Sequence, residues 1–205
     1  MHIGILGAGN VGGTLGRALA RAGHHVHYAR RDPGSPTPDA LRHEGATTGS
    51  ARDIVARAEV MLLATPWGAT QQALTDAGDL GGRALLDATN PLGPGLTLTH
   101  GHTDSGGEQV QRWAPTARVV KVFNTTGVEN MANPAHDGGR AVMLACGDDD
   151  DAVALAVQLA GDIGFDALAF GPLRNARLLE PLARTWIELA MVRKLGRGVA
   201  FGLLR

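Results

Sequence analysis

Residues 7–12 read Gly7-Ala8-Gly9-Asn10-Val11-Gly12, and they stand between an apolar run that starts at His2 and a stretch rich in alanine and leucine. This is the G-x-G-x-x-G pattern in the strand–turn–helix context that a dinucleotide requires. Gly7 permits the tight turn, Gly9 leaves room for a pyrophosphate beside the backbone, and Gly12 lets the helix pack close to the strand. The first N–H groups of the helix carry a partial positive charge that attracts phosphates. The stretch therefore predicts a site for NAD(P) or FAD.

Two arginines stand at the end of the second predicted strand. Residues 25–29 form a strand-like run after a helix stop at Gly23, and Arg30-Arg31-Asp32 follows. A protein that prefers NAD carries Asp or Glu here, about 20 residues after the glycine turn, to bond the ribose 2′-hydroxyl. Two guanidinium groups instead suit a 2′-phosphate, because they are permanently charged and bind it through paired hydrogen bonds. We therefore expect NADP(H), with Asp32 as a ribose ligand for NAD if the register is shifted by one residue.

The composition excludes several classes of protein. The 205 residues are enough for a single α/β unit with a sizeable core. A net charge of −1 and an aromatic content of 4% argue against a nucleic-acid-binding protein, which needs a basic field or stacking platforms. The single Cys146 cannot form an intramolecular disulfide, and no apolar stretch approaches the roughly 20 residues of a membrane span. We expect a cytoplasmic protein that binds neither nucleic acid nor membrane.

Short apolar runs alternate with helical patterns along the chain, which is typical of the α/β class with a parallel sheet. The expected strands are 2–6, 25–29, 59–64, 83–88, 118–123, 141–146 and 165–169, with a weak one at 46–48. The expected helices are 10–22, 50–57, 68–77, 106–113, 149–161 and a long one over 174–194. Residues 32–38 and 91–107 are expected to be loops, and the second is long enough to flank a site. The pattern predicts a Rossmann-type, doubly wound and mostly parallel sheet.

Polar residues follow three of the predicted strands. In an open parallel sheet, ligands bind at the carboxyl ends of the strands, so these residues share one edge. Asparagine amides can pair with a nicotinamide carboxamide or with ribose hydroxyls, and a tryptophan or proline face can cover a flat ring. The alternative is that Asn-Pro and Asn-Thr simply form turns. The three segments are Thr65-Pro66-Trp67, Thr89-Asn90-Pro91 and Asn124-Thr125-Thr126-Gly127.

No acid–base pair typical of a carbonyl-reducing dehydrogenase is present. The chain has neither a Tyr-x-x-x-Lys nor a Ser-x-x-x-Lys arrangement at the expected place, and its one tyrosine, Tyr28, lies in a predicted cofactor-side strand. His100 and His102 lack the further ligands that a metal site needs, so no metal is expected. Lys121 lies inside a predicted strand, where we expect a structural role. This pattern is compatible with hydride transfer between two bound cofactors, in which the protein mainly supplies orientation. We expect the transfer near Trp67, Asn90, Asn124 and Thr125, without an essential histidine.

These segments, taken together and in order, resemble the coenzyme F420-dependent NADP oxidoreductase family, F420 being a deazaflavin. The resemblance also extends to the cytoplasmic reductase domain of the six-transmembrane metalloreductases, notably over residues 121–125. Because the chain ends at Arg205 without a membrane domain, we do not expect metalloreductase physiology to carry over. The matching motifs are the glycine turn, Arg30-Arg31, residues 65–67, residues 87–91, Val120-Lys121-Val122-Phe123-Asn124-Thr125, Cys146-Gly147-Asp148-Asp149, and Gly171-Pro172-Leu173 followed by Ala176-Arg177.

The resemblance implies a Rossmann-like NADP-binding domain over residues 1–170 and a small C-terminal helical part over residues 171–205 that packs on it. The C-terminal part would contact the second cofactor or another subunit, in a homodimer. The implied reaction moves hydride between NADP(H) and a flavin-type acceptor, namely F420, FMN or FAD. The alternatives are reduction of a small imine or carbonyl compound, and a non-catalytic NADP(H)-binding redox sensor. The expected cofactor-binding residues are Gly7, Ala8, Gly9, Asn10, Val11, Gly12, Arg30, Arg31, Thr65, Pro66, Trp67, Asn90, Asn124, Thr125 and Gly127.

The C-terminal segment carries two further expectations. Leucines and Trp186 recur at helical spacing over 174–194, which indicates a core or subunit face. Pro181 is expected to kink this helix or to mark its true start. The Gly-rich, apolar tail over 195–202 is expected either to line the pocket of a second cofactor or to complete the core.

Overall fold

The computed structural model describes the backbone of residues 1–205 and every side chain except that of Ala40. Its centre is an eight-stranded sheet in which all neighbours run parallel except β6 and β9. The glycine turn leaves β1 beside the point where the chain order reverses, between β1 and β4. Such a switch point is where open α/β sheets bind ligands. Across the sheet the strands are β10 (Asp166–Ala169), β9 (Val142–Gly147), β6 (Arg118–Lys121), β5 (Ala84–Asp87), β4 (Val60–Leu63), β1 (His2–Leu6), β2 (His25–Ala29) and β3 (Ala46–Gly49).

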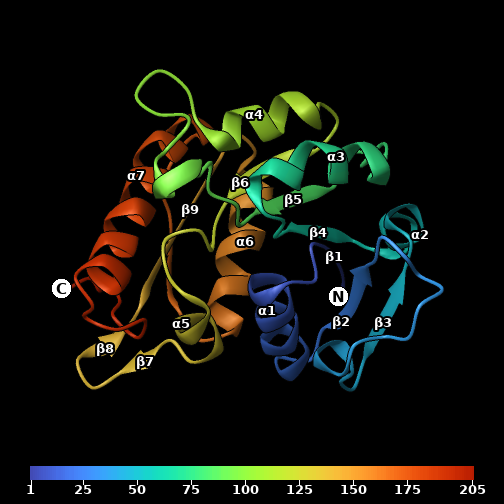
Figure 1. The fold of residues 1–205 in the computed structure, drawn as a ribbon, viewed down its shortest axis with the longest axis horizontal. Coiled ribbons are helices and arrows are strands. Elements are labelled where there is room, and N and C mark those ends of the chain that lie inside the picture. Colours follow the sequence, from blue (N-terminus) through green and yellow to red (C-terminus); the bar gives the residue numbers. More distant parts are fainter.

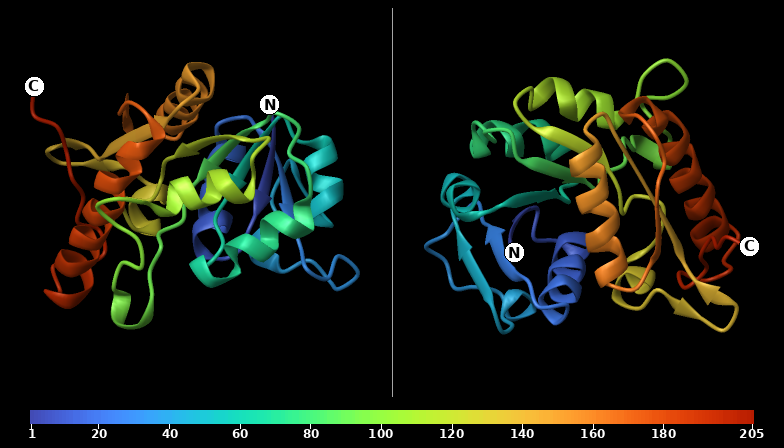
Figure 2. Two further views of the ribbon diagram at one scale, coloured as in Figure 1. Left: turned by 90° about the horizontal axis from the view of Figure 1, so that it is seen from above. Right: turned by 180° about the vertical axis from the view of Figure 1, so that it is seen from behind.

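Helices cover both faces of the sheet (Figure 1; Figure 2). One face packs on α1 (Asn10–Arg21), α5 (Val128–Ala132) and α6 (Asp150–Asp162). The other packs on α2 (Ala51–Arg57), α3 (Trp67–Ala77) and α4 (Gly106–Trp113). Because both faces are covered, a central strand can be apolar at every position, as β4 is, and all four residues of β4 are fully buried. Side chains alternate between the two cores, with Leu62 in the first and Leu63 in the second.

The remaining elements are short. Three 3₁₀ turns occur at Asp39–Leu41, Pro94–Leu96 and Leu173–Asn175. A small antiparallel hairpin joins β7 (Ala135–His136) to β8 (Gly139–Arg140). The expected elements included neither this hairpin nor α5. Among the described residues, no helix is long and apolar enough to cross a bilayer.

The predicted fold class is confirmed, and every expected strand is present. The strand ends agree with the expectation to within one residue, except that β6 stops at Lys121 rather than at residue 123. The reason is Phe123, whose φ of +62° lies in the left-handed region and turns the chain away from the sheet. The Phe123 N–H accordingly points to Met143 Sδ, 3.1 Å away, instead of to a neighbouring strand.

The helix expected over 174–194 is present as a continuous run of helical turns over residues 173–192, but it is not one regular α-helix. The segment divides into the 3₁₀ turn at Leu173–Asn175, α7 (Ala176–Ile187) and a π-helical turn at Glu188–Val192. The helix cannot reach residue 194, because Lys194 adopts a φ of +58°. Pro181 lies inside α7, so it does not mark the start of the helix.

The C-terminal tail returns along the sheet edge after the π-helical turn. The backbone N–H of Val142 in β9 donates to the Phe201 carbonyl at 2.8 Å, so the tail lies along the start of β9. Trp186 of α7 donates from Nε1 to the Val199 carbonyl at 2.6 Å and packs with Val199 and Phe201. The tail therefore completes a small apolar cluster with α7 at the far edge from β3 (Figure 1).

Candidate functional site

The glycine turn leaves no room for side chains at two of its three glycines. Gly7 has a φ of +100°, and a Cβ there would lie 2.6 Å from the Ala64 carbonyl. A Cβ at Gly12 would collide with the Gly7 carbonyl oxygen. A Cβ at Gly9, in contrast, would meet nothing within 4 Å, because this position faces open space. Gly7 and Gly12 are thus required by the fold, whereas Gly9 leaves a free space beside the start of α1.

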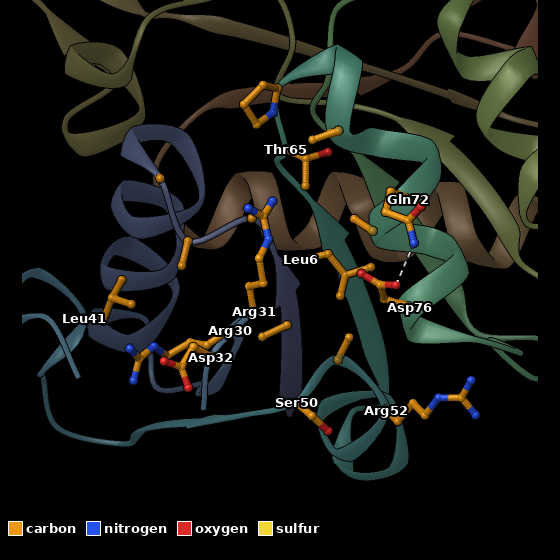
Figure 3. A pocket seen from close by; sticks show the side chains of 18 of the residues that line it. Leu6, Arg30, Arg31, Asp32, Leu41, Ser50, Arg52, Thr65, Gln72 and Asp76 are labelled. Carbon is orange, nitrogen blue, oxygen red and sulfur yellow. Dashed lines mark hydrogen bonds between the residues drawn. The ribbon is translucent and has the colours of Figure 1, made fainter. Parts of the chain in front are cut away.

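That free space opens into a cavity of about 840 Å³ at the carboxyl ends of β1, β2 and β4. This volume lies within the range that is typical of small-molecule pockets. Gly7, Ala8 and Gly9 form one side, and the start of α2 and the first turns of α3 form the opposite side (Figure 3). The expected phosphate site is therefore an open pocket in the structure.

The two arginines after β2 lie differently in this cavity. Arg30 donates from Nη1 to the Ser35 carbonyl at 2.6 Å and from Nη2 to the Pro36 carbonyl at 3.2 Å. It therefore braces the loop over residues 32–38. Arg31 is exposed, has no hydrogen-bond or ion-pair partner among the described residues, and extends from the end of β2 into the cavity (Figure 3). The structure thus leaves Arg31 available to an anionic ligand.

Asp32 is occupied by its own loop. Its Oδ1 accepts the Gly34 N–H at 3.1 Å, and its Oδ2 accepts the Ser35 hydroxyl. The Ser35 hydrogen bond is the largest cause that holds the pKa of this carboxyl below its usual range. Both oxygens thus accept hydrogen bonds within the loop, and the alternative role of Asp32 as a ribose ligand for NAD stays a prediction.

The opposite wall contains residues that the sequence analysis did not single out. Ser50 caps α2, with its side chain accepting the Asp53 N–H at 3.2 Å. Gln72 and Asp76 of α3 line the cavity and are joined by a 2.8 Å hydrogen bond (Figure 3). Arg52 borders the cavity too, but its side chain points away from it (Figure 3). The capping pattern at Ser50 and Asp53 was visible in the sequence, but nothing in it showed that α2 faces α1 across a pocket.

The segment after β4 divides between the cavity and a neighbouring aromatic cluster. Thr65 and Pro66 line the cavity, and the Thr65 hydroxyl pairs with that of Thr70 at 2.9 Å. Trp67 turns away from the cavity lining, and its ring packs 5.2 Å from Trp113 and 5.5 Å from His100, between ring centroids. The expected ring-covering role of Trp67 therefore remains a prediction.

Asn90 and Asn124 bridge the ends of β5 and β6. Asn90 Nδ2 donates to the Asn124 carbonyl at 2.8 Å, and Asn124 Nδ2 donates to Asn90 Oδ1 at 3.1 Å. The same Asn124 amide also donates to the Leu179 carbonyl of α7 at 3.2 Å. Asn124 Oδ1 is buried and has no hydrogen-bond partner among the described residues. Because a buried acceptor without a partner is costly, this oxygen would gain from a ligand N–H donor. Neither asparagine lines the open cavity, and their cofactor-binding role stays a prediction.

Thr125 and Gly127 pack inward after Asn124. The Thr125 hydroxyl lies 4.0 Å from Met143 Sδ, and Thr125 is 4% exposed. A Cβ at Gly127 would lie 2.5 Å from the Trp186 ring, so glycine is needed there to let α7 approach. Neither residue lines the open cavity, and their cofactor-binding role stays a prediction.

Lys121 is fully buried beside these strand ends. Its Nζ lies 2.7 Å from Asp87 Oδ2 and 3.0 Å from Glu180 Oε1, and donates to the Thr89 carbonyl at 2.8 Å. Burial alone would lower the pKa of the ammonium, but the two carboxylates outweigh burial and raise it. Lys121 is therefore charged. The sequence predicted a structural position in a strand but gave no sign of Glu180, which lies on α7.

Other titratable groups offer no evident chemistry. Burial raises the pKa of the Cys146 thiol to about 12, which excludes a thiolate nucleophile at neutral pH. His102 and His136 are exposed, and His100 pairs with the hydroxyl of Thr99 at 3.0 Å. No group of three or more His, Cys, Asp or Glu side chains suited to a metal ion occurs in the part of the chain that the structure describes.

Comparisons with known proteins agree with this geometry. Residues 2–91 match the model of the family described as NADP oxidoreductase, coenzyme F420-dependent. A solved candidate F420-dependent NADP reductase from Arthrobacter sp. FB24 is 35% identical, with 99% of each chain covered and a TM-score of 0.90. A hypothetical protein from Sinorhizobium meliloti is 25% identical, with 100% of this chain and 96% of the other covered and a TM-score of 0.79.

A curated relative is longer than this chain. The metalloreductase STEAP3 of Rattus norvegicus is 28% identical over 180 residues, which are 88% of this chain and 36% of the rat protein. The chain thus spans about a third of the length of that relative.

Substitutions at Gly9 and Gly12 separate nucleotide binding from folding. Gly9→Val places a side chain in the free space beside the turn, so we expect loss of NADPH binding with an unchanged circular dichroism spectrum and thermal midpoint. Gly12→Ala, the matched control, forces α1 away from β1 and should lower the free energy of unfolding by about 1–3 kcal/mol. Calorimetric titration and thermal melts measure both effects. A folded Gly9→Val protein with wild-type NADPH affinity would show that the turn is not the phosphate site.

Proposed function

The chain belongs to the coenzyme F420-dependent NADP oxidoreductase family, and we propose on that basis that it transfers hydride between NADP(H) and a flavin-type acceptor, namely F420, FMN or FAD. The part of this proposal that concerns NADP(H) rests on the cavity between the glycine turn and Arg31. An 840 Å³ pocket that begins at a helix N-terminus and contains an unpaired guanidinium suits a dinucleotide with an additional phosphate.

Within this proposal the glycine turn and α1 hold the pyrophosphate. The open position at Gly9 lets the phosphates approach the backbone, and the N-terminus of α1 supplies N–H donors. Arg31 holds the 2′-phosphate, while Arg30 fixes the loop from which Arg31 reaches into the cavity. Bound NADPH supplies a hydride from its nicotinamide ring, which together with one proton reduces the acceptor by two electrons.

We place the hydride transfer at the strand ends next to Thr65 and Pro66. Trp67, Asn90, Asn124, Thr125 and Gly127 are the proposed residues of this region, with Asn124 Oδ1 as an acceptor for a ligand N–H group. No acid–base pair is needed here, because water can supply the proton and positioning of the two rings governs the rate. The side chains of this site therefore act by orientation.

We also propose that residues 171–205 form the acceptor and subunit side of the molecule and that the protein is a homodimer. Leu178 of α7 is 59% exposed, and Val192 and Leu195 beyond it are 52% and 64% exposed. These side chains lie in α7 and in the segment directly after it, and exposed apolar surface of this kind commonly marks a subunit contact. Light scattering at micromolar protein concentration should give twice the monomer mass, and Leu178→Glu should return it to the monomer mass.

The acceptor is tested by following the loss of NADPH absorbance with F420, FMN, FAD, a cyclic imine and a ferric chelate offered in turn. We expect turnover with one or more of the three flavin-type acceptors. Gly9→Val, which cannot bind NADPH, is the control for non-enzymatic reduction. Turnover of the imine alone would assign the protein to imine reduction. Binding of NADPH without turnover of any acceptor would instead support a redox sensor.

Cofactor preference is tested at the arginines. Arg31→Ala should weaken NADPH binding by about 1.5–3 kcal/mol, the value of a hydrogen bond to a charged group, and leave NADH affinity unchanged. Arg52→Ala removes a cation of the same cavity rim that points away from the pocket, and should affect neither cofactor. Arg30→Ala should weaken NADPH less than Arg31→Ala, because Arg30 acts through the loop. Equal losses of NADPH and NADH in Arg31→Ala, measured by calorimetry, would exclude a 2′-phosphate contact.

A further inference from the structure

The buried ion group around Lys121 is costly, and stability alone does not account for it. Lys121, Asp87 and Glu180 are each at most 1% exposed, so one cation and two carboxylates are removed from water together. Replacement of such groups by apolar side chains is often neutral or stabilising. A buried charge group of this kind therefore suggests a role in fixing a conformation.

The members of the group contact one another and neighbouring backbone groups. The ammonium has three N–H donors, and three acceptors surround it, from Asp87, Glu180 and Thr89. Glu180 also accepts the N–H groups of Gly106 and Gly107 at 2.9 and 3.0 Å, at the N-terminus of α4. These donors offset the excess negative charge of the group. The result is a junction of ion pairs and hydrogen bonds between β5, β6, α4 and α7.

The junction leads directly to the asparagine pair. Asp87 Oδ1 accepts both the N–H and the hydroxyl of Thr89, at 2.9 and 2.7 Å, while Lys121 binds the Thr89 carbonyl. Thr89 is thus held on both sides, and Asn90 is the next residue. On the other side, Asn124 donates to Leu179, which precedes Glu180.

These contacts close a ring through the protein. It runs from Lys121 to Thr89, through Asn90 and Asn124 to Leu179, and back through Glu180 to Lys121. The Asn124 side-chain oxygen is the acceptor of this ring that is left without a partner among the described residues. Between Lys121 and Asn124, the left-handed backbone at Phe123 sets the direction of the chain, and such strain is typical of functional positions.

We propose that Lys121, with Asp87 and Glu180, is the positioning residue of the hydride-transfer site, and that it acts by fixing the carboxamide of Asn124 against the nicotinamide side of the dinucleotide. This inference rests on the proposed function. Lys121 is sealed from solvent and lies outside the open cavity, so it does not touch the ligand itself. Its effect reaches the ligand through Thr89, Asn90 and Asn124.

The test compares Lys121→Met, Glu180→Gln and Asn124→Ala with Leu159→Ala, a core substitution in α6 that serves as a control for lost stability. The acceptor that the wild-type protein reduces in the screen described above is used in single-turnover experiments. In Lys121→Met and Glu180→Gln the hydride-transfer rate constant should fall about 10- to 100-fold, as expected when reacting groups are misplaced by about 1 Å. NADPH affinity, which the glycine turn and Arg31 mainly set, should change far less than the rate constant. Leu159→Ala should lower the thermal midpoint and leave the rate constant unchanged. Glu180→Gln is the milder change if Lys121→Met does not fold.

A double-mutant cycle identifies the route of the effect. If Lys121 acts through Asn124, the double variant Lys121→Met/Asn124→Ala should be no slower than Asn124→Ala alone. Additive losses, or a rate constant in Lys121→Met equal to that of the wild type, would overturn the proposal.

If the wild-type protein reduces no acceptor, the proposed function fails and the positioning role is judged by NMR. The side-chain amide signals of Asn90 and Asn124 should then shift in Glu180→Gln and stay in place in Leu159→Ala. Unchanged asparagine signals in Glu180→Gln would overturn the positioning role as well.

Discussion

The interaction on which the arrangement of this molecule depends is the ion group of Lys121 with Asp87 and Glu180. It joins a strand end, a neighbouring strand and the C-terminal helix at a point closed to water. Inside a protein, loss of one partner leaves a charge without compensation, which typically costs about 3–5 kcal/mol. The three elements are therefore bound to one geometry, and α7 cannot shift along the sheet without breaking the group.

Two parts of the ligand-binding edge follow different physical rules. The glycine turn and Arg31 face an open cavity, where free N–H groups and the unpaired Arg31 guanidinium are available to an anionic ligand. The ends of β5 and β6 are instead closed and internally bonded, and Asn124 Oδ1 is a buried acceptor there without a hydrogen-bond partner among the described residues. A dinucleotide that lies across both parts would be bound by charge at one end and oriented by a rigid amide at the other. This division agrees with the proposed transfer of hydride between two rings that the protein orients.

The fold was predictable because its signals are local. Strands such as β4 are apolar throughout, since helices cover both faces, and the glycine turn identifies the first β–α unit. The sequence failed where distant contacts decide. Phe123 ends β6 early by adopting a left-handed φ, and Lys194 ends the last helix in the same way. No local pattern predicts a left-handed backbone at a phenylalanine or a lysine, because its cost is met by packing elsewhere.

The sequence by itself determined the Rossmann-type sheet, the glycine turn and the presence of two arginines after β2. These depend on residue spacing and on backbone freedom, which the chain carries in order. The tertiary structure alone decided that Arg30 braces a loop while Arg31 stays free, that Trp67 packs with Trp113, and that Glu180 meets Lys121 across 59 positions of sequence. The physical reason is that partners in hydrogen bonds and ion pairs are chosen by distance in space, which no spacing along the chain reveals.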